Sequence, residues 1–305
     1  MKKKSTRLTS YFWLLVNTVT WGVALVIVKP AFEVTTPFRF LFYRYLLAVV
    51  LSLPWFIFFW EKHKKNFWHN FKKITWLELL GTTLTLSLLY FGLERTTAIE
   101  ASLLTTTTPI FVILAGVFLL KEKQELHENI GLLLAFLGTV AITLLPVLSN
   151  GGLAQLSVTG NLLIIGQNIT TAIYFILAKK HYHHLSKMFV VSISFWIGLV
   201  SFFGLSLFEL GFDLPSFVTA VSTDFQHQSV WVASVYMAVF GSIIGLTAYI
   251  KGQDGIEASE ASYFNYLQPL IYLPLAYVML GEQVSWSQIL LLCLVLAGVL
   301  IAEKR

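Results

Sequence analysis

The chain has 305 residues and a formal net charge of +5, yet only 12% of its residues are charged and 56% are hydrophobic. Its mean hydropathy is +0.74, whereas about 25% of the residues of a typical soluble domain are charged. This composition excludes a soluble globular protein and indicates an integral membrane protein.

Ten apolar stretches follow one another along the chain, each long enough, at about 20 residues, to cross a hydrocarbon core of roughly 30 Å. The links between them are mostly short and contain the Pro, Gly, Asn and charge clusters that end helices. The first stretch has no cleavage site of small residues and is expected to remain as a helix. We predict an all-α integral membrane protein with ten transmembrane helices, at 11–32, 38–60, 74–94, 99–120, 127–148, 158–180, 187–210, 229–250, 259–280 and 286–302.

The second half of the chain repeats the first. Glu100-Ala101-Ser102 and Pro109 return 160 residues later as Glu260-Ala261-Ser262 and Pro269. Nearer the front of each copy the offset is 150, so that Thr20 corresponds to Thr170 and Lys29 to Lys179. Five helices is an odd number, so the second copy must enter the membrane in the opposite orientation. We predict two inverted five-helix repeats, at 11–145 and 158–303.

The basic residues predict the orientation in the membrane. With a cytoplasmic N-terminus, most of the 21 lysines and arginines face the cytoplasm, and only Lys29, Arg39, Arg44 and Arg95 lie toward the outer face or within the membrane. Both termini are therefore expected to be cytoplasmic, in the cell (plasma) membrane. The same basic links face an anionic leaflet, which explains the net charge without nucleic acid as a partner.

Several of these residues together resemble a known transporter repeat. The runs Tyr90 to Leu93 and Ala101 to Leu104, with Pro109, Glu122 and Gly138, resemble the EamA repeat of the drug/metabolite transporter superfamily, and Arg44 also fits that pattern. The resemblance implies a secondary transporter, often an exporter of amino acids or other small metabolites, with a central cavity between two repeats. The second copy departs from the pattern, since Arg44 aligns with Ser194 and Gly131 with Leu291.

Polar side chains at membrane depth are the candidates for substrate binding, because hydrocarbon offers them no hydrogen-bond partner and they must face other helices or a wet cavity. Aromatic walls and amides would suit a small amphiphilic or zwitterionic metabolite. The open alternative is that these residues form interfacial belts or join helices. The candidates are Asn17, Trp21, Tyr90, Asn168, Tyr174, Tyr263, Asn265, Tyr266 and Gln268.

Two prolines predict bent helices. Pro109 follows four threonines, and its ring crowds the carbonyl of Thr105, so that we expect a kink in which threonine hydroxyls satisfy the freed backbone groups. Pro269 repeats the kink in the second copy. These helices are either moving parts of a gate or contain prolines without a role in motion.

Charged residues at the helix ends suggest two latches. Lys29 with Glu100 would form an outer latch, and Lys179 with Glu260 an inner one, broken alternately as the repeats rock. The alternative is that each Glu is stabilised by a helix dipole and each Lys extends to the membrane surface.

Arg44 lies deep enough in its helix to need a partner, which is either an anionic group of the substrate or one of Glu33 and Glu94. None of the 16 acidic residues clearly lies at mid-membrane, so exchange or facilitated transport is as compatible with the sequence as proton-driven transport. The segment from Gly211 to Ser229 is expected to be a poorly ordered loop, or a cap on the outer mouth.

The sequence favours a secondary transporter over two alternatives: a flippase for a lipid-linked substrate and a membrane-embedded enzyme. No catalytic residues are expected, because His, Asp and Glu do not recur at helical spacing near a membrane surface, and no metal site or cofactor is expected. No nucleotide-binding glycine loop is present, which argues against ATP-driven pumping by this chain. The expected partners are a small-molecule substrate and the lipid bilayer. The oligomeric state remains open.

Overall fold

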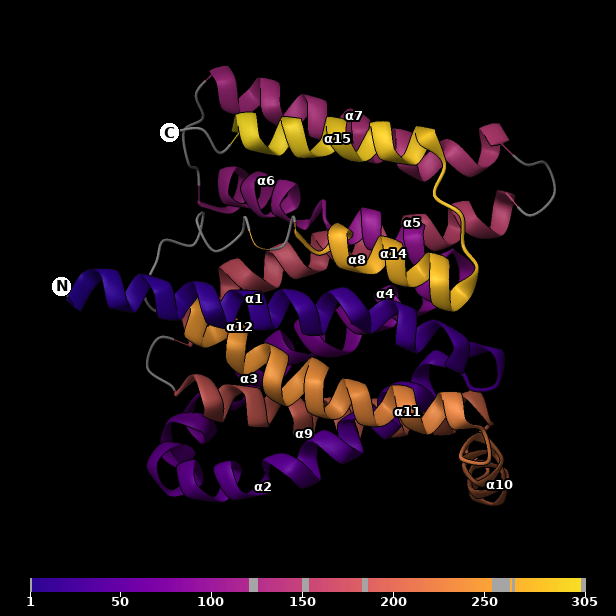
Figure 1. Cartoon of the computed structure of the whole chain (residues 1–305). Coiled ribbons are helices and arrows are strands. Elements are labelled where there is room, and N and C mark those ends of the chain that lie inside the picture. Colours follow the sequence, from indigo (N-terminus) through magenta and orange to yellow (C-terminus); the bar gives the residue numbers. More distant parts are fainter. Residues whose placement is uncertain are drawn as a thin grey trace.

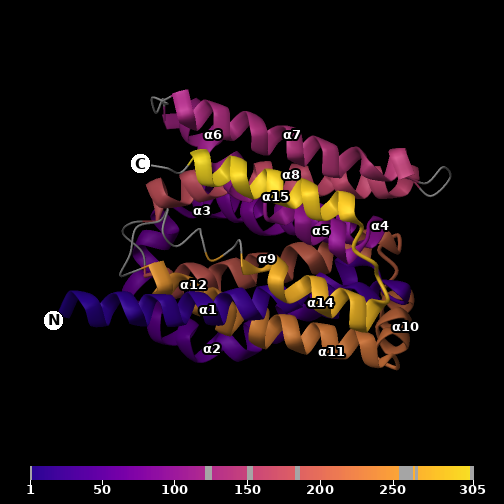
Figure 2. The ribbon, with the colours of Figure 1, turned by 45° about the horizontal axis from the view of Figure 1, so that its top comes forward.

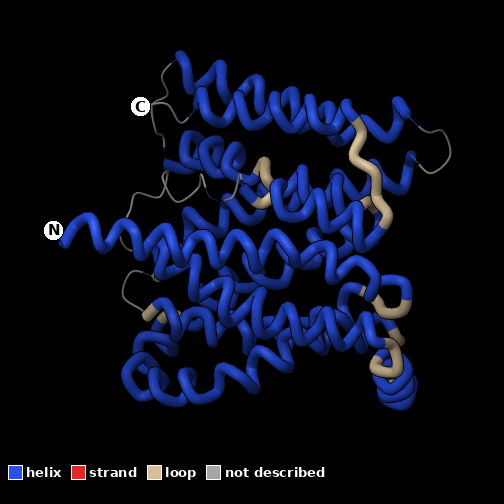
Figure 3. Tube along the Cα trace, viewed as in Figure 1, coloured by secondary structure: helices blue, strands red, loops and turns tan. Residues whose placement is uncertain are grey.

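The computed structural model describes residues 2–120, 126–149, 154–182, 186–253, 264 and 267–302. Within these ranges every regular element is a helix (Figure 3). The expectation of an all-α protein is therefore confirmed for this part of the chain.

The first half runs from a long N-terminal helix to the helix that ends at Ser149 (Figure 1). Its first predicted stretch is extended by a 3₁₀ helix, its third contains a π-helix, and its fourth is divided by a turn. Its elements are α1 (Lys2–Val28), the 3₁₀ helix η1 (Lys29–Glu33), α2 (Pro37–His69), α3 (Phe71–Glu78), the π-helix η2 (Leu79–Leu84), α4 (Thr85–Arg95), α5 (Ala98–Thr105), α6 (Thr108–Leu120) and α7 (Leu126–Ser149).

The second half repeats this order with one additional helix, α10. Its elements are α8 (Ala154–His181), α9 (Lys187–Glu209), α10 (Leu214–Asp224), α11 (Gln228–Tyr236), the π-helix η3 (Met237–Ile244), α12 (Gly245–Gln253), α14 (Pro269–Leu280) and α15 (Trp286–Ala302).

The expectation of a poorly ordered loop at 211–229 was wrong, because α10 occupies most of it. Asp213 caps the helix by accepting a hydrogen bond from the Ser216 amide at 3.1 Å, and Pro215 lies in its first turn. Proline is favoured at that position, since its missing N–H would have no partner there. The last residue of α10, Asp224, is buried and anchors the helix to the first half of the chain.

Six helical segments are long and apolar enough to cross a membrane by length and composition, namely 7–33, 37–69, 71–95, 157–178, 188–209 and 228–249. Shorter apolar helices lie at 98–112, 129–142, 269–280 and 286–298. Together these segments coincide with the ten predicted stretches. The fourth stretch is interrupted between α5 and α6, and α6 continues to Leu120.

Helices that correspond in the two halves pack in corresponding ways. The α7 and α15 helices lie side by side and run in opposite directions (Figures 1 and 2), and α2 packs against α9. The packing of α4 on α8 is matched by that of α12 on α1, and the packing of α5 and α6 on α8 is matched by that of α14 on α1. Each half therefore supplies one long helix, α1 or α8, to the other half.

Two π-helices mark the same place in the two halves. The η2 segment contains Gly81 and the η3 segment contains Gly241, 160 residues later. A π turn is rare and occurs mostly where a helix carries a functional irregularity. Its recurrence at one offset indicates a repeated structural feature.

Close glycine contacts also recur in pairs. A Cβ atom on Gly92 would lie 2.6 Å from Ile164, and one on Gly252 would lie 2.5 Å from Leu14. Gly252 follows Gly92 by 160 residues and Ile164 follows Leu14 by 150, the two offsets found in the sequence. Small residues let membrane helices approach closely, and packing is a main source of their association.

We predict that Gly92→Ala lowers the stability of the detergent-solubilised protein by about 1–3 kcal/mol, because the added methyl group would also lie 2.8 Å from the Gly160 carbonyl oxygen. Gly204→Ala is the matched control, since nothing lies within 4 Å of its added Cβ. Thermal unfolding should show the control unchanged or slightly stabilised. Equal midpoints for the two variants would contradict this account of α4 on α8.

Candidate functional site

The break between α5 and α6 is stabilised by its own threonines. The hydroxyls of Thr105, Thr106, Thr107 and Thr108 each lie 2.6–2.9 Å from the carbonyl oxygen three residues earlier. Within a membrane, backbone carbonyls that lack their usual helical hydrogen bond need such donors. The predicted interruption before Pro109, with hydroxyls satisfying the backbone, is therefore present.

Asn168 on α8 fills this break from the other half of the chain. It is fully buried, and its amide nitrogen donates to the Leu104 carbonyl at 2.8 Å and to the Thr107 hydroxyl at 3.0 Å. The hydroxyl of Thr108 lies 2.7 Å from its amide oxygen. Asn168, a polar residue predicted from the sequence, thus forms hydrogen bonds to the interrupted segment between α5 and α6.

The equivalent contact exists on α1. The hydroxyl of Thr18 donates to the Phe264 carbonyl at 3.0 Å. Thr18 precedes Asn168 by 150 residues and Leu104 precedes Phe264 by 160. Each long helix therefore bonds to a backbone carbonyl of the other half just before the repeated proline.

Asn17 and Trp21 face the π-helix η3 and the start of α12 in the second half. The Asn17 amide donates to the Gly245 carbonyl and the Trp21 indole donates to the Gly241 carbonyl, both at 3.0 Å. The Trp21 ring also stacks on Tyr249, with 5.5 Å between centroids. Both predicted residues lie between the halves, and both have protein partners in this conformation.

Arg44 is a buried cation without a carboxylate partner. Its side chain donates from Nε to Ser242 at 3.1 Å and from Nη1 to Tyr90 at 3.0 Å, and its guanidinium lies 5.4 Å from the Tyr45 ring. No ion pair joins it to an acidic residue in the described part of the chain. The suggested pairing with Glu94 was wrong, because Glu94 pairs with Arg95 at 2.5 Å, and Glu33 is exposed at the helix end.

Arg44 lies where the two halves meet, and two of its guanidinium N–H groups donate hydrogen bonds, to Ser242 and to Tyr90. A guanidinium has five N–H donors in a planar fork that matches a carboxylate. Its two neighbours are Tyr90 on α4 and Ser242 on η3, which are hydroxyl groups and leave its charge uncompensated. This arrangement can bind an anionic group.

Sequence reasoning missed a second buried charge carrier, Glu78. This residue has no exposed surface, and its carboxylate accepts hydrogen bonds from Thr82 at 3.0 Å, Tyr174 at 3.1 Å and Tyr182 at 2.7 Å. The sequence analysis did not single out Glu78 as a buried carboxyl group. A lone Glu between Leu77 and Leu79 was the signal in the sequence.

Tyr182 closes this cluster just beyond the membrane-spanning part of α8. Burial, and then the neighbouring Glu78 carboxyl, raise the pKa of the Tyr182 hydroxyl above its usual value. The hydroxyl therefore keeps its proton and acts as a donor to Glu78. Tyr174, a predicted substrate ligand, has the same role in this conformation.

The predicted outer latch does not form as a direct pair. Lys29 Nζ donates to the carbonyls of Leu93, Glu94 and Thr96 at 2.6, 3.1 and 2.5 Å. Glu100 instead accepts hydrogen bonds from three neutral groups, on Thr96, Ser157 and Asn161. All three ammonium protons of Lys29 are thus used by the end of a helix rather than by a carboxylate.

Some predicted residues lie outside the described part of the chain, or only their backbone is described. Gln268 is half-buried directly before α14, and its carbonyl accepts from the amides of Ile271 and Tyr272. Pro269 starts α14, so the second proline also follows an interruption. Glu260, Tyr263, Asn265 and Tyr266 lie outside the described residues, as does the side chain of Lys179.

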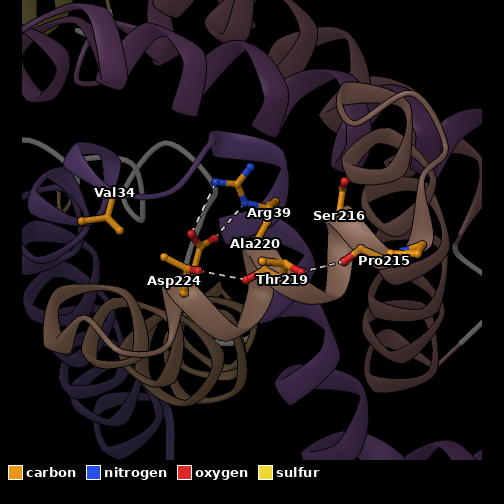
Figure 4. Close-up of a pocket in the computed structure, with 8 residues that line it drawn as sticks. Val34, Arg39, Pro215, Ser216, Thr219, Ala220 and Asp224 are labelled. Atoms are coloured by element: carbon orange, nitrogen blue, oxygen red, sulfur yellow. Dashed lines mark hydrogen bonds and ion pairs between the residues drawn. The ribbon is translucent and has the colours of Figure 1, made fainter.

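A hollow of about 480 Å³ lies beside α10 (Figure 4). Asp224 at its wall accepts hydrogen bonds from Thr35, Arg39 and Tyr43, the last two at 2.8 and 2.7 Å. Arg39 is therefore neutralised and structural, unlike Arg44. The lining residues are Val34, Arg39, Pro215, Ser216, Thr219, Ala220, Thr223 and Asp224.

Paired helix breaks, helices exchanged between two halves and a buried cation between them define a multi-pass membrane transport protein. The model of the EamA-like transporter family matches residues 8–144 and 158–303. The chain belongs to this family, within the drug/metabolite transporter superfamily. This is a family of transporters and not of enzymes.

Similar proteins carry the same general description. The uncharacterized transporter YetK of Bacillus subtilis is 28% identical over 70% of this chain, and the match covers 62% of that protein. An uncharacterized transporter of Archaeoglobus fulgidus is 25% identical over 97% of this chain and 98% of its own length. A protein of known crystal structure shares the fold over 98% of this chain and 96% of its own, with a TM-score of 0.60 and 15% identity.

We predict that Asn168→Ala destabilises the purified protein by about 1–3 kcal/mol, because it removes a buried donor from the α5–α6 break. Asn70→Ala is the control, since the Asn70 amide is exposed and bonds only within its own helix end, so a change within about 0.5 kcal/mol is expected. Thermal unfolding in detergent measures both. A neutral Asn168→Ala would show that the break does not depend on α8.

Proposed function

We propose that this protein is a secondary transporter that exports a small metabolite, such as an amino acid, by alternating access between two inverted five-helix repeats at 11–145 and 158–303. The proposal places the protein in the plasma membrane with both termini in the cytoplasm. In its fold, α8 contacts the first half in the same way as α1 contacts the second half. A transporter with two equivalent sets of contacts can adopt either an inward-open or an outward-open state.

The matched hydrogen bonds support the inverted arrangement. Asn168 bonds to Leu104 and Thr18 bonds to Phe264 with the same partner type at the same point of each repeat. The opposite direction of α7 and α15 is what an odd number of helices per repeat requires (Figure 2). A substrate path between the repeats would then be bordered by two equivalent broken helices.

The observation that carries the choice of substrate is the uncompensated Arg44. A buried charge without a partner is costly, and the usual solutions are an ion pair or a ligand. Because the described carboxylates have other partners or lie elsewhere, a carboxylate on the substrate is the simplest counter-ion. Tyr90 and Trp21 add aromatic surface nearby in the fold, which suits an amino acid with an apolar side chain.

We expect cells that produce the intact chain to accumulate one or more carboxylate-bearing metabolites in the medium. Arg44→Gln should abolish this accumulation, and Arg44→Lys should reduce it at least about tenfold, because an ammonium group does not reproduce the planar fork. The measurement is comparative metabolite profiling of cells and medium. Lys64→Gln is the control, because Lys64 is exposed and bonds to Glu61 at the surface.

Other outcomes separate the alternatives. Accumulation inside the cells would reverse the proposed direction of transport. A change confined to lipid-linked compounds in the outer leaflet would favour a flippase. Unchanged export by Arg44→Gln would show that this cation does not bind the substrate.

A further inference from the structure

The helices form two mixed bundles. The first consists of α1, α11, α12 and α14, and the second of α3, α4, α5, α6 and α8, while α2 and α9 pack mainly on each other, as do α7 and α15. Each bundle contains helices from both halves of the chain. Motion of one bundle against the other would therefore have to break the contacts that cross between them.

One crossing contact is made by Lys29, which follows α1 in the first bundle. Its ammonium group holds three carbonyl oxygens at the C-terminal end of α4 in the second bundle. The carbonyl end of a helix carries a partial negative charge, so a cation is favoured there. The contact is half-buried, which weakens screening by salt.

A second crossing contact is made by Glu282, directly after α14 in the first bundle. Its two carboxylate oxygens accept hydrogen bonds from the amides of Ala98 and Ile99, at 2.8 and 2.9 Å. These amides begin α5 in the second bundle, where a helix favours an anion. Gly281 adopts a left-handed conformation, with φ of 66°, which ends α14 and turns the chain toward α5.

The two contacts hold opposite sides of one short connector. Thr96 and Thr97 join α4 to α5, with Lys29 on the carbonyl end before them and Glu282 on the amide end after them. A cation on a helix C-terminus and an anion on the next helix N-terminus both act with the backbone dipoles. Neither contact needs a charged side chain on the second bundle.

We propose that Lys29 and Glu282 form a clasp that holds the outer end of the transport path closed, and that the clasp opens once in each transport cycle. This inference rests on the alternating access proposed above. The clasp replaces the Lys29–Glu100 pair, since Glu100 bonds only within the second bundle. Glu282 thereby has a gating role, in which its carboxylate binds the backbone amides of Ala98 and Ile99.

The repeat predicts a matching inner clasp. Lys179 follows Lys29 by 150 residues and Glu122 precedes Glu282 by 160. The connector at 96–97 corresponds to residues 256–257. This inner clasp is a prediction from the sequence repeat alone, because the structure describes only the backbone of Lys179 among these residues. The inner clasp would form when the outer one is open, so that weakening the outer clasp favours the outward-open state and weakening the inner clasp favours the inward-open state.

The test is the labelling rate of a buried cysteine from outside the cell. Ser102→Cys in a Cys293→Ser background places a thiol one helical turn beyond Ala98, at a position that is 1% exposed. Intact cells are treated with a membrane-impermeant maleimide. We expect Lys29→Gln and Glu282→Gln each to raise the labelling rate about tenfold or more, since each removes charge-assisted hydrogen bonds that hold the closed state.

The matched control is Arg95→Gln. Arg95 is a cation at the same helix end, but it bonds to Phe91 and Glu94 of its own helix. Its substitution should leave the labelling rate unchanged. The use of two independent clasp variants keeps the test valid if one of them is poorly produced, and size-exclusion chromatography of each purified variant confirms its folded state.

The inner variants Lys179→Gln and Glu122→Gln separate failure of the clasp from failure of the transport mechanism. If they lower outside labelling while the outer variants leave it unchanged, the protein alternates but the clasp is not its outer gate. If no variant changes the rate, both the clasp and alternating access are overturned. A rise in both outer variants, absent from Arg95→Gln, supports the clasp.

Discussion

Hydrocarbon offers no hydrogen-bond partner to a backbone carbonyl, so a membrane helix can be interrupted only where the protein itself supplies a donor. In this chain the donors at the α5–α6 break are four threonine hydroxyls and the amide of Asn168. The amide comes from the other half of the chain. The interrupted helix and the long helix beside it therefore depend on each other, and the same dependence recurs between α1 and the residues before α14.

This dependence determines how the two halves are assembled. Because α1 packs with the second half and α8 with the first, the packing favours two mixed bundles as the moving units of the alternating access proposed above. In that proposal, polar contacts between the bundles control the change of conformation. Arg44 on α2 bridges Ser242 of η3 and Tyr90 of α4 in the interior, while Lys29 and Glu282 cross between the bundles at one end.

The sequence predicted those features that recur as residue types at fixed offsets. The matched Glu, Pro and Lys residues identified the repeat, the threonines before Pro109 identified the helix break, and the apolar stretches identified the ten helical segments. Prediction from the sequence failed where a charged side chain bonds to the backbone, because every residue has a backbone carbonyl and the sequence does not mark the one that is used. Lys29 was assigned to Glu100 on opposite charge, whereas three carbonyls provide a better arrangement of acceptors. Glu78 was overlooked because its partners are distant hydroxyls, on Tyr174 and Tyr182.

The central claim is that the outer and inner ends open in turn, and pairs of spin labels at equivalent positions test it most directly. In a Cys293→Ser background, labels at Glu33 and Glu94 report the outer end, and labels at His183 and Asp254, offset by 150 and 160, report the inner end. Alternating access predicts that the fraction of molecules with a short outer distance equals the fraction with a long inner distance, and that Glu282→Gln shifts both together. Short distances at both ends in every variant, or long distances at both, would contradict it.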